Sequence, residues 1–338
     1  DERVLAAFRL EGATAALDAL AVAREAARYI RRAQAADGRF RLVVDRVSGK
    51  PEDGYSMKAH CAAAWALVEF HGASPEPMGL ACAGRALEYV VDRRLGHFGG
   101  ALTVVQGGRI STGAVAMAAL AFASFAAAAE NEIYRRVAEG LAAYLVTCVD
   151  DKGKVHCGFR SAETVVVLNP GGRHLAGEIA LALAVVHGLS PRPDFIDVAR
   201  LLLENHPNAA WDDPPWHDSF AARAWACAPE LLASRLCARL CERMGEDALD
   251  HSHYLLADSA AALVAASEVL MSYYELRRDP AILEAVAGVL DRARAWQMAD
   301  GPCAGAFIDT PEDATVDVGH TSASLAAFAR YHRLRSAA

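Results

Sequence analysis

The chain has 338 residues, of which 54% are hydrophobic and 22% charged, and its formal net charge is -8 with a pI near 5.8. This acidic balance, without a visible basic stripe, argues against a nucleic-acid partner. The abundance of alanine favours helices over sheets and predicts an all-α protein. Because closed toroids and barrels of this length are often one domain, we expect one domain over residues 1–338.

Membrane insertion and disulfide bonding are not expected from the sequence. The longest apolar stretch, "AVAMAALAFASFAAAA", is short and rich in alanine, so no membrane-spanning helix is predicted. The eight cysteines lie mostly on apolar helical faces, as buried thiols do in a reducing compartment, which favours a cytoplasmic location. The sequence begins at Asp1 rather than at methionine, which leaves a removed leader open.

Apolar residues recur every three or four positions along most of the chain, and clusters of Gly, Pro and Asp interrupt them. This pattern predicts helices of ordinary length. They are expected near residues 14–36, 56–72, 78–94, 111–129, 131–149, 173–188, 194–205, 216–227, 229–244, 254–276, 280–298 and 317–335, which makes twelve helices.

The predicted helices alternate in character. The odd-numbered ones carry more charge, as in "EIYRRVAEGLAAYL", whereas the even-numbered ones are almost wholly small and apolar, as in "GAVAMAALAFASFAA". A helix that is apolar all round belongs inside a protein, and a one-sided helix belongs outside. We therefore expect six helical hairpins in an (α/α)6 toroid, with an inner ring of six helices and an outer ring of six. An irregular helical solenoid is the alternative.

Glycine-rich turns that end in an aromatic residue follow several of the outer helices. They read "QAADGRF" (34–40), "RRLGHFGG" (93–100), "DDKGKVHCGF" (150–159) and "QMADGPCAGAF" (297–307). Self-similarity of this kind is typical of stacked supersecondary units and favours the toroid.

Polar residues gather at the starts of the six inner helices. The six stretches are "GYSMKAH" (54–60), "GGRISTG" (107–113), "GGRHLAGE" (171–178), "WDDPPWHDS" (211–219), "DHSHYLLADS" (250–259) and "DATVDVGHTS" (313–322). In a toroid of hairpins all inner helices run the same way, so we expect these starts to meet at one end, the mouth. Buried ionisable groups are costly unless paired or used, so the mouth is the predicted active site.

Glu178 and Asp258 are the main candidates for acid–base catalysis, because each is expected one to two turns inside an apolar helix, beyond capping range. Desolvation there raises the pKa of a carboxyl towards the working range of a general acid. His174 shares a helical face with Glu178 at i, i+4, and Asp317 shares one with His320 at i, i+3.

The other candidates have narrower roles. His60, His174 and His320 are expected to transfer protons or orient the substrate, and Arg109 and Arg173 to hold an anionic group. The full set of predicted substrate-binding residues is Tyr55, Arg109, Arg173, Trp211, Trp216, His217, Asp218 and His253.

Most of these residues also have a purely structural explanation. Some would be ordinary N-caps or first-turn residues of helices, namely Ser111, Thr112, Asp218 and Asp317. Others would simply pack in the core, namely Tyr55, His60, Trp211 and Trp216. His251 and His253 are placed to ligate a metal with His217 or His320, but no complete ligand set is visible, so neither a metal nor another cofactor is expected.

The segment "ADSAAALVAASEVLMSYYEL" (257–276) resembles an inner helix of the unsaturated glucuronyl hydrolases, with Asp258, Ser259, residues 260–262 and residues 265–267 as the matching positions. "GHTSASL" is similar to sequences of the sugar 2-epimerases, and "QAADGRF" resembles the glutamine- and glycine-containing repeats of triterpene cyclases. The first two resemblances imply six-hairpin carbohydrate-active enzymes. The tryptophan-serine-arginine-glycine-glutamine stretch of the hydrolases and the acidic initiator motif of the cyclases do not occur in this sequence.

The sequence therefore predicts an enzyme that acts on a sugar or uronic-acid-like substrate by general acid–base chemistry, as a hydrolase, lyase or epimerase. One alternative is a cyclase or tailoring enzyme of a terpenoid or peptide pathway, and another is a non-catalytic ligand-binding protein. The expected partner is a small molecule or saccharide. Substrate identity and oligomeric state stay open.

Overall fold

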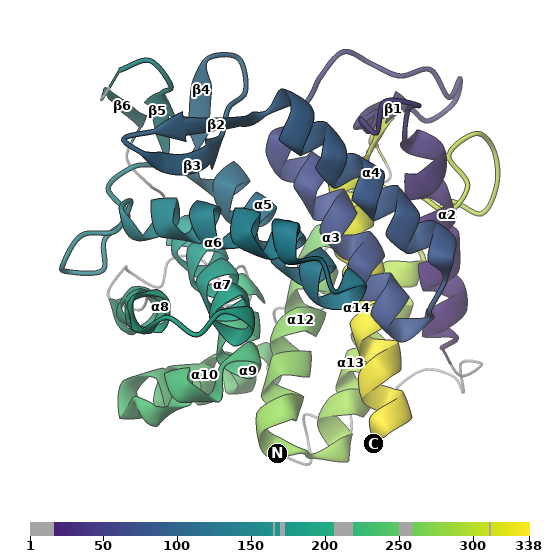
Figure 1. The fold of residues 1–338 in the computed structure, drawn as a ribbon. Coiled ribbons are helices and arrows are strands. Elements are labelled where there is room, and N and C mark those ends of the chain that lie inside the picture. Colours follow the sequence, from purple (N-terminus) through teal and green to yellow (C-terminus); the bar gives the residue numbers. More distant parts are fainter. Residues whose placement is uncertain (1–16, 165, 170–172, 206–218, 250–258, 311) are drawn as a thin grey trace.

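The computed structural model describes residues 17–164, 166–169, 173–205, 219–249, 259–310 and 312–338 (Figure 1). Within these ranges the chain forms twelve α-helices, one short 3-10 helix, η3 (Pro229–Ala233), and seven short strands. The all-α toroid predicted from the sequence is confirmed, and the strands are small additions to it.

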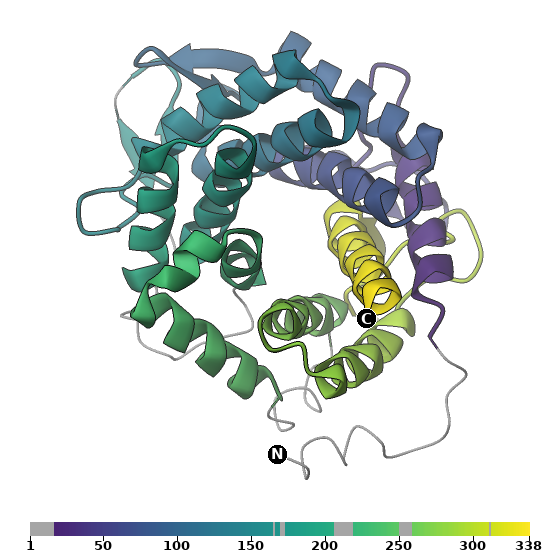
Figure 2. The same ribbon diagram turned by 60° about the horizontal axis from the view of Figure 1, so that its bottom comes forward.

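Six helices form a closed inner ring in which each packs against the next, and the last packs against the first (Figure 2). In ring order these are α3 (Met57–Ala73), α5 (Thr112–Ala129), α7 (Arg173–Leu189), α9 (Ser219–Cys227), α12 (Ala260–Arg277) and α14 (Val318–Ala337). The outer helices are α2 (Ala19–Ala33), α4 (Pro77–Arg93), α6 (Glu132–Val146), α8 (Pro193–Asn205), α10 (Arg235–Leu249) and α13 (Pro280–Arg294). The even-numbered helices of the sequence prediction are thus the inner ones.

Burial explains the alternation between inner and outer helices. The inner helix α5 is buried at almost every residue from Thr112 to Ala126, whereas α2 buries one face, with residues such as Val22, Ala26 and Ile30. By length and composition α5 could cross a membrane, in contrast to the sequence prediction that this apolar stretch is too short, but 78% of it is buried inside the protein. A core helix surrounded by other helices has this same composition.

The strands lie in the long connections that precede inner helices, at the upper end of the view in Figure 1. All pairings are antiparallel, and the three sheets are β1 (Val43–Asp45) with β7 (Thr315–Asp317), β2 (Leu95–Phe98) with β3 (Ala101–Val104), and β4 (Arg109–Ser111) with β5 (Phe159–Ser161) and β6 (Val167–Asn169). The first sheet joins the segments before α3 and α14, and the third joins those before α5 and α7. They tie together the starts of neighbouring inner helices.

The repeated turn "QAADGRF" attaches one outer helix to the next. The Gln34 side-chain amide donates hydrogen bonds to the carbonyl oxygens of Gly38, at 3.1 Å, and of Cys82 on α4, at 2.9 Å. Gly38 has a φ of +88°, and a Cβ atom there would lie 2.2 Å from the carbonyl oxygen of Arg85. The buried Phe40 pairs with Gln34 and closes the turn. The glycine is therefore required both by conformation and by close packing.

The turn "QMADGPCAGAF" is built in the same way. The Gln297 amide donates to the carbonyl oxygens of Gly305, at 3.1 Å, and of Val22 on α2, at 3.0 Å. A third turn closes through the pairing of Val149 with Val155, so a valine occupies the place of the glutamine. The fourth repeated stretch forms the β2–β3 hairpin instead. In the two turns that begin with glutamine, the sequence repeat thus marks contacts between neighbouring outer helices.

Candidate active site at the mouth

The mouth is the end of the toroid where the inner helices begin. Four of these helices start with a side chain that accepts a hydrogen bond from the first turn, namely Ser56, Ser111, Ser259 and Asp317. Asp317 accepts from the Gly319 backbone N–H at 2.5 Å. Ser111 and Asp317 therefore act as N-caps, in line with the structural explanation for these residues. Converging helix N-termini give the mouth positive dipole ends, which suit anionic or hydroxyl-rich ligands.

A buried carboxylate lies at the mouth, one and a half turns into α7. The Glu178 side chain is 5% exposed and forms an ion pair with the Lys58 ammonium group of α3, which is 41% exposed. The helix between them in the ring is α5, and its residue Gly113 faces the pair: a Cβ atom there would lie 2.9 Å from Glu178 Oε2 and 3.0 Å from Leu175 Cδ2. Gly113 thus leaves the space in which the carboxylate sits. The sequence prediction of a buried Glu178 is consistent with this placement.

Two other predicted residues lie near the same end of the molecule. Arg109 is exposed on β4, where it pairs with Ser161 of β5, and His320 is exposed in the first turn of α14. Both side chains face solvent and are free to meet a ligand that approaches the mouth.

His60 and Tyr55 lie between the rings and do not approach the Glu178–Lys58 pair. His60 is fully buried, with Nε2 at 3.0 Å from the Ala86 carbonyl oxygen of α4, and its ring packs at 5.1–5.6 Å between centroids against Phe40, Tyr55 and Tyr89. Burial lowers the pKa of His60 to about 4, so it is neutral near pH 7. The structure thus places these two residues in the core rather than towards the ring axis.

Several predicted residues lie outside the described parts of the chain. They are Asp258, Trp211, Trp216, His217, Asp218 and His253, and the side chains of Arg173 and His174 are likewise not described. The helix predicted from residue 254 begins at Ala260, with Ser259 as its N-cap. Among the side chains that are described, no three His, Cys, Asp or Glu residues come together as a metal site.

The opposite end of the ring, the base, is where the inner helices finish, and it contains a buried network of charges. On α9, Arg223 donates to Glu69 Oε2 of α3 at 2.9 Å and to Glu268 Oε1 of α12 at 3.2 Å. Arg330 of α14 also binds Glu268, and it donates to Glu275 at 2.6 Å. The network links four of the six inner helices.

The charges of this network compensate one another. Arg333 adds a third guanidinium, which donates to Glu69 Oε2 at 2.7 Å, so three arginines face three glutamates. Burial by itself would raise the pKa of Glu69, but Arg223 and Arg333 outweigh burial and lower it to about 2. A carboxyl that stays ionised down to such a pH cannot exchange protons near neutrality. We therefore interpret the base network as structural.

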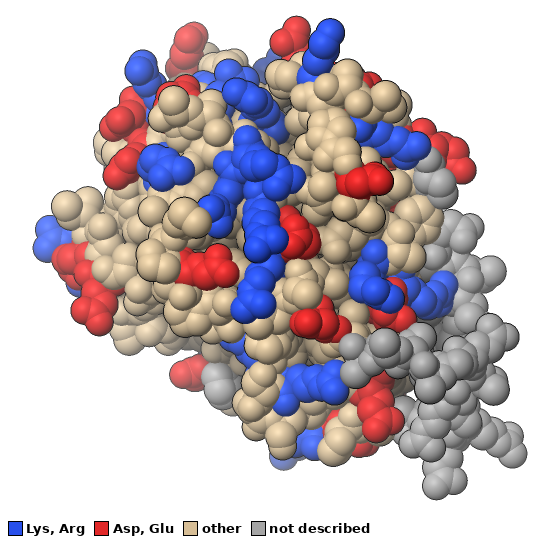
Figure 3. Space-filling model, turned by 90° about the vertical axis from the view of Figure 1, so that its right-hand side faces the viewer, with Lys and Arg blue, Asp and Glu red and all other residues tan. Residues whose placement is uncertain are grey.

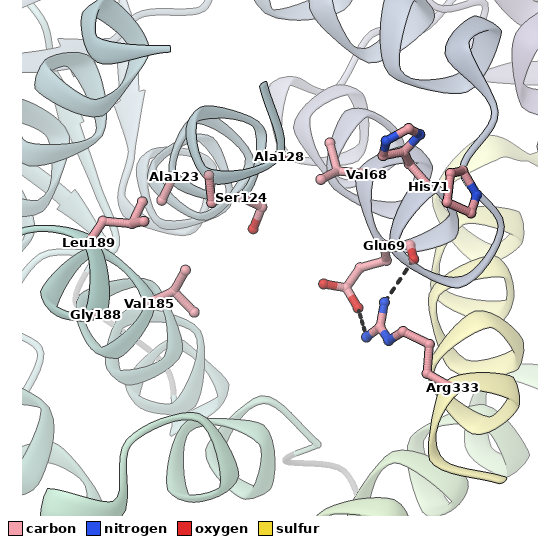
Figure 4. Close-up of a pocket in the computed structure, with 13 residues that line it drawn as sticks. Val68, Glu69, His71, Ala123, Ser124, Ala128, Val185, Gly188, Leu189 and Arg333 are labelled. Atoms are coloured by element: carbon pink, nitrogen blue, oxygen red, sulfur yellow. Dashed lines mark hydrogen bonds and ion pairs between the residues drawn. The ribbon is translucent and has the colours of Figure 1, made fainter. Parts of the chain in front are cut away.

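A pocket of about 590 Å³ opens beside this network (Figure 4). Glu69 and Arg333 form one side of it, and small or apolar residues of α5 and α7, such as Ala123, Val185 and Leu189, form the other. Its polar wall is thus made of groups that already bind each other.

An arginine-lined groove lies on the outer face of the toroid. Lys and Arg side chains form a band on the face shown in Figure 3, and on this side Arg28, Arg31 and Arg32 of α2 and Arg85 of α4 line a groove of about 380 Å³. Arg28 is paired with Glu25, at 2.5 Å. The groove belongs to the outer helices and is separate from the mouth.

The sequence prediction missed Lys58, Gly113 and the base network. The position of Lys58 could have been predicted from helical spacing. It lies seven residues before Trp65 and eleven before Glu69, so the three share one face of α3, and that face points to the ring axis. Arg223 and Glu268 each stand as a charged residue inside an apolar stretch, "AARAW" and "AASEV".

No protein-family model matches the chain, and no curated protein sequence is similar to it. Solved structures do match over nearly their whole length. A GH76 alpha-mannanase of Bacteroides thetaiotaomicron is 11% identical, with 95% of this chain and 97% of that chain covered and a TM-score of 0.74. A sugar epimerase from a ruminal bacterium is 12% identical, with 92% and 98% covered and a TM-score of 0.73.

An unsaturated glucuronyl hydrolase specific for heparin is 11% identical, with 94% of this chain and 98% of that chain covered and a TM-score of 0.70. At these identities the matches concern the fold. They agree with the resemblance to six-hairpin enzymes that the sequence suggested. The chain thus has the (α/α)6 toroid fold that carbohydrate hydrolases share with sugar epimerases and isomerases.

Proposed function

We propose that this protein is an enzyme that acts on a sugar or uronic-acid-like substrate at the mouth, with Glu178 as its general base. The observation that carries the proposal is the buried ion pair between Glu178 and Lys58 at the converging starts of α3, α5 and α7. The fold adds support, because the structural neighbours named above are carbohydrate-active enzymes.

The pair favours proton abstraction over glycosidic hydrolysis. An ammonium group in contact with a carboxylate stabilises the ionised form, and an ionised carboxylate accepts a proton but does not donate one. Glycosidases need a protonated carboxyl as the acid beside an ionised base or nucleophile, so a hydrolase would need its acid from another residue. We therefore favour an epimerase, isomerase or lyase, in which Glu178 removes a proton from a carbon next to a carbonyl or carboxyl group.

Lys58 has a second role in this proposal. Its ammonium group is partly exposed, so it can bind a substrate oxygen while it holds Glu178 in place. A uronic acid carboxylate or an enediol oxygen suits such a point charge. Arg109 on β4 is a further exposed cation for an anionic substrate.

The test is turnover of a panel of aldoses, disaccharides and unsaturated or saturated uronides in D₂O. Wild-type protein is expected to incorporate deuterium at the abstracted position, and Glu178→Gln is expected to lose at least about a thousandfold in rate, since an amide cannot act as the base. The control is Glu88→Gln, which changes an exposed glutamate of α4. Both variants should keep the wild-type helical CD signal and melting temperature.

Two results would overturn parts of the proposal. Turnover of a glycoside without deuterium incorporation would assign hydrolysis and remove the base role. Unchanged turnover by Glu178→Gln would move the active site away from this pair.

A further inference from the structure

The third repeated turn is closed differently from the other two. Val149 stands where the other turns have a glutamine, so the side-chain amide that ties those turns is missing here. The turn instead has a cysteine on each side, with Cys148 just before it and Cys157 just after. The His156 backbone N–H donates to the Cys148 carbonyl oxygen at 3.1 Å, which brings the two segments together.

The two thiols are buried and in contact. Both cysteines are fully buried, and the Cys148 thiol donates a hydrogen bond to the Cys157 sulfur. The Arg160 guanidinium donates from Nε to Cys157 Sγ at 3.1 Å, and the Thr112 hydroxyl lies 3.9 Å from Cys148 Sγ. One sulfur thus has a neighbouring positive charge and a thiol donor.

This arrangement shifts the pKa values of the two thiols in opposite directions. The hydrogen bond from Cys148, supported by Arg160 and opposed by burial, lowers the pKa of Cys157, and the same hydrogen bond raises the pKa of Cys148. Cys157 is therefore the thiolate of the pair and Cys148 its proton-bearing partner. Thiolate, not thiol, attacks oxidants.

We propose that Cys148 and Cys157 form a reversible redox site, in which hydrogen peroxide converts the pair to a disulfide. Cys157 sulfur attacks one peroxide oxygen, the O–O bond breaks, and hydroxide leaves and takes up a proton to become water. Cys148 then attacks the resulting sulfenic acid, its proton is lost, the S–O bond breaks, and a second water leaves. The two thiols give up two electrons and two protons, and one peroxide becomes two waters.

The site has a direct connection to the mouth. Thr112, the first residue of α5, donates from its hydroxyl to the Cys157 carbonyl oxygen at 2.6 Å and from its backbone N–H to the Gly158 carbonyl oxygen at 3.0 Å. The next residue is Gly113, which faces Glu178. The disulfide would therefore join the segment that follows α6 to the segment that Thr112 binds at the start of α5, next to the candidate base. The redox chemistry itself does not depend on the proposed enzymatic function.

Access to the pair favours a small oxidant. The guanidinium of Arg160 lies over the rings of Phe98, at 4.7 Å, and Tyr144, at 5.6 Å, and its residue is half-buried. This cover admits peroxide more readily than a bulky disulfide such as oxidised glutathione. Peroxide is thus the reagent for the test.

The experiment treats the reduced full-length protein with hydrogen peroxide, alkylates the remaining thiols after denaturation, and maps peptides by mass spectrometry. The expected product is a peptide pair joined through Cys148 and Cys157, with a mass loss of two hydrogens that dithiothreitol reverses. The built-in control is the pair Cys237 and Cys241, which are buried one turn apart on α10 and are expected to stay reduced.

Variants assign the roles of the three side chains. Cys148→Ser is expected to leave a sulfenic acid on Cys157 that dimedone traps, Cys157→Ser to give no product, and Arg160→Met to slow the reaction by about tenfold or more. Circular dichroism of each variant checks folding. The proposal is overturned if the wild type shows no joined peptide, if Cys157 is only over-oxidised, or if Cys237 and Cys241 join at the same rate.

Discussion

Two largely buried glutamates at opposite ends of the inner ring show how environment separates roles. Glu178 at the mouth pairs with the partly exposed ammonium group of Lys58, while Glu69 at the base pairs with two guanidinium groups that belong to a larger network. Both lie inside apolar helices, so burial by itself does not identify an acid–base group. The two differ in their setting: Glu69 belongs to a network of three arginines and three glutamates and binds Arg223, which is 8% exposed. Glu178 instead binds Lys58, which is 41% exposed.

The largest expected effect concerns the base. Arg330→Met removes a buried partner of Glu268 and Glu275 and should lower the free energy of unfolding by about 3–5 kcal/mol, because it leaves three carboxylates with only two guanidinium groups. Urea denaturation measures the change. The control is Arg136→Met, whose exposed pair with Glu132 should contribute little to stability. Equal stability of the two variants would contradict a structural role for the network.

The next effect concerns His60, a polar residue near the mouth that does not face it. Its pKa is about 4 in the folded protein and 6.5 ordinarily, so between these values the unfolded state binds more protons. The contribution of neutral His60 to the free energy of unfolding is therefore fully present above pH 6.5 and is lost as the pH falls towards 4. From pH 7 to pH 4, wild-type unfolding free energy should fall by about 3 kcal/mol more than that of His60→Gln. Parallel pH curves would place His60 in contact with solvent.

The smallest effect on stability is expected at the mouth, together with a clear effect on activity. Gly113→Ala places a methyl group against the end of the Glu178 side chain, which can shift, so the loss of stability should be about 1 kcal/mol. The displaced carboxylate should lower kcat/KM by about tenfold to a hundredfold.

The matched control for this variant is Gly188→Ala on α7, where the added methyl meets open space and should raise stability by up to about 1 kcal/mol. Unchanged kcat/KM in Gly113→Ala would show that the position of Glu178 does not matter for turnover.

The fold was largely predictable because the composition of each helix indicates how much of its surface is buried. Stretches that are apolar all round became inner helices, and one-sided stretches became outer ones. The strands at the mouth were less predictable. β1 and β7 pair although almost the whole chain lies between them, and the sequence of such short strands does not indicate which distant strand they pair with. The repeated turns were visible in sequence, but their role in joining outer helices depends on contacts such as that of Gln34 with Cys82.

The sequence predicted how far inside its helix Glu178 lies, but not which residue it pairs with. The position of Glu178 inside α7 follows from sequence alone, whereas its partner Lys58 lies 120 residues away on α3, which α5 separates from α7 in the ring. His60 illustrates the other difficulty. It lies two residues from Lys58, and thus about 200° around the helix, so it points to the outer ring. Which side of a helix faces the ring axis depends on how the helices pack in the assembled toroid, so the sequence of one helix does not determine it.

The most direct test of the division between mouth and base compares two variants of identical chemistry, Glu178→Gln and Glu69→Gln. The quantity to measure is kcat/KM per folded molecule, on whichever sugar or uronide the wild type converts. We expect a fall of at least about a thousandfold for Glu178→Gln, and for Glu69→Gln a protein that is less stable but turns over normally when folded. Normal turnover by Glu178→Gln together with loss of turnover by folded Glu69→Gln would contradict this division.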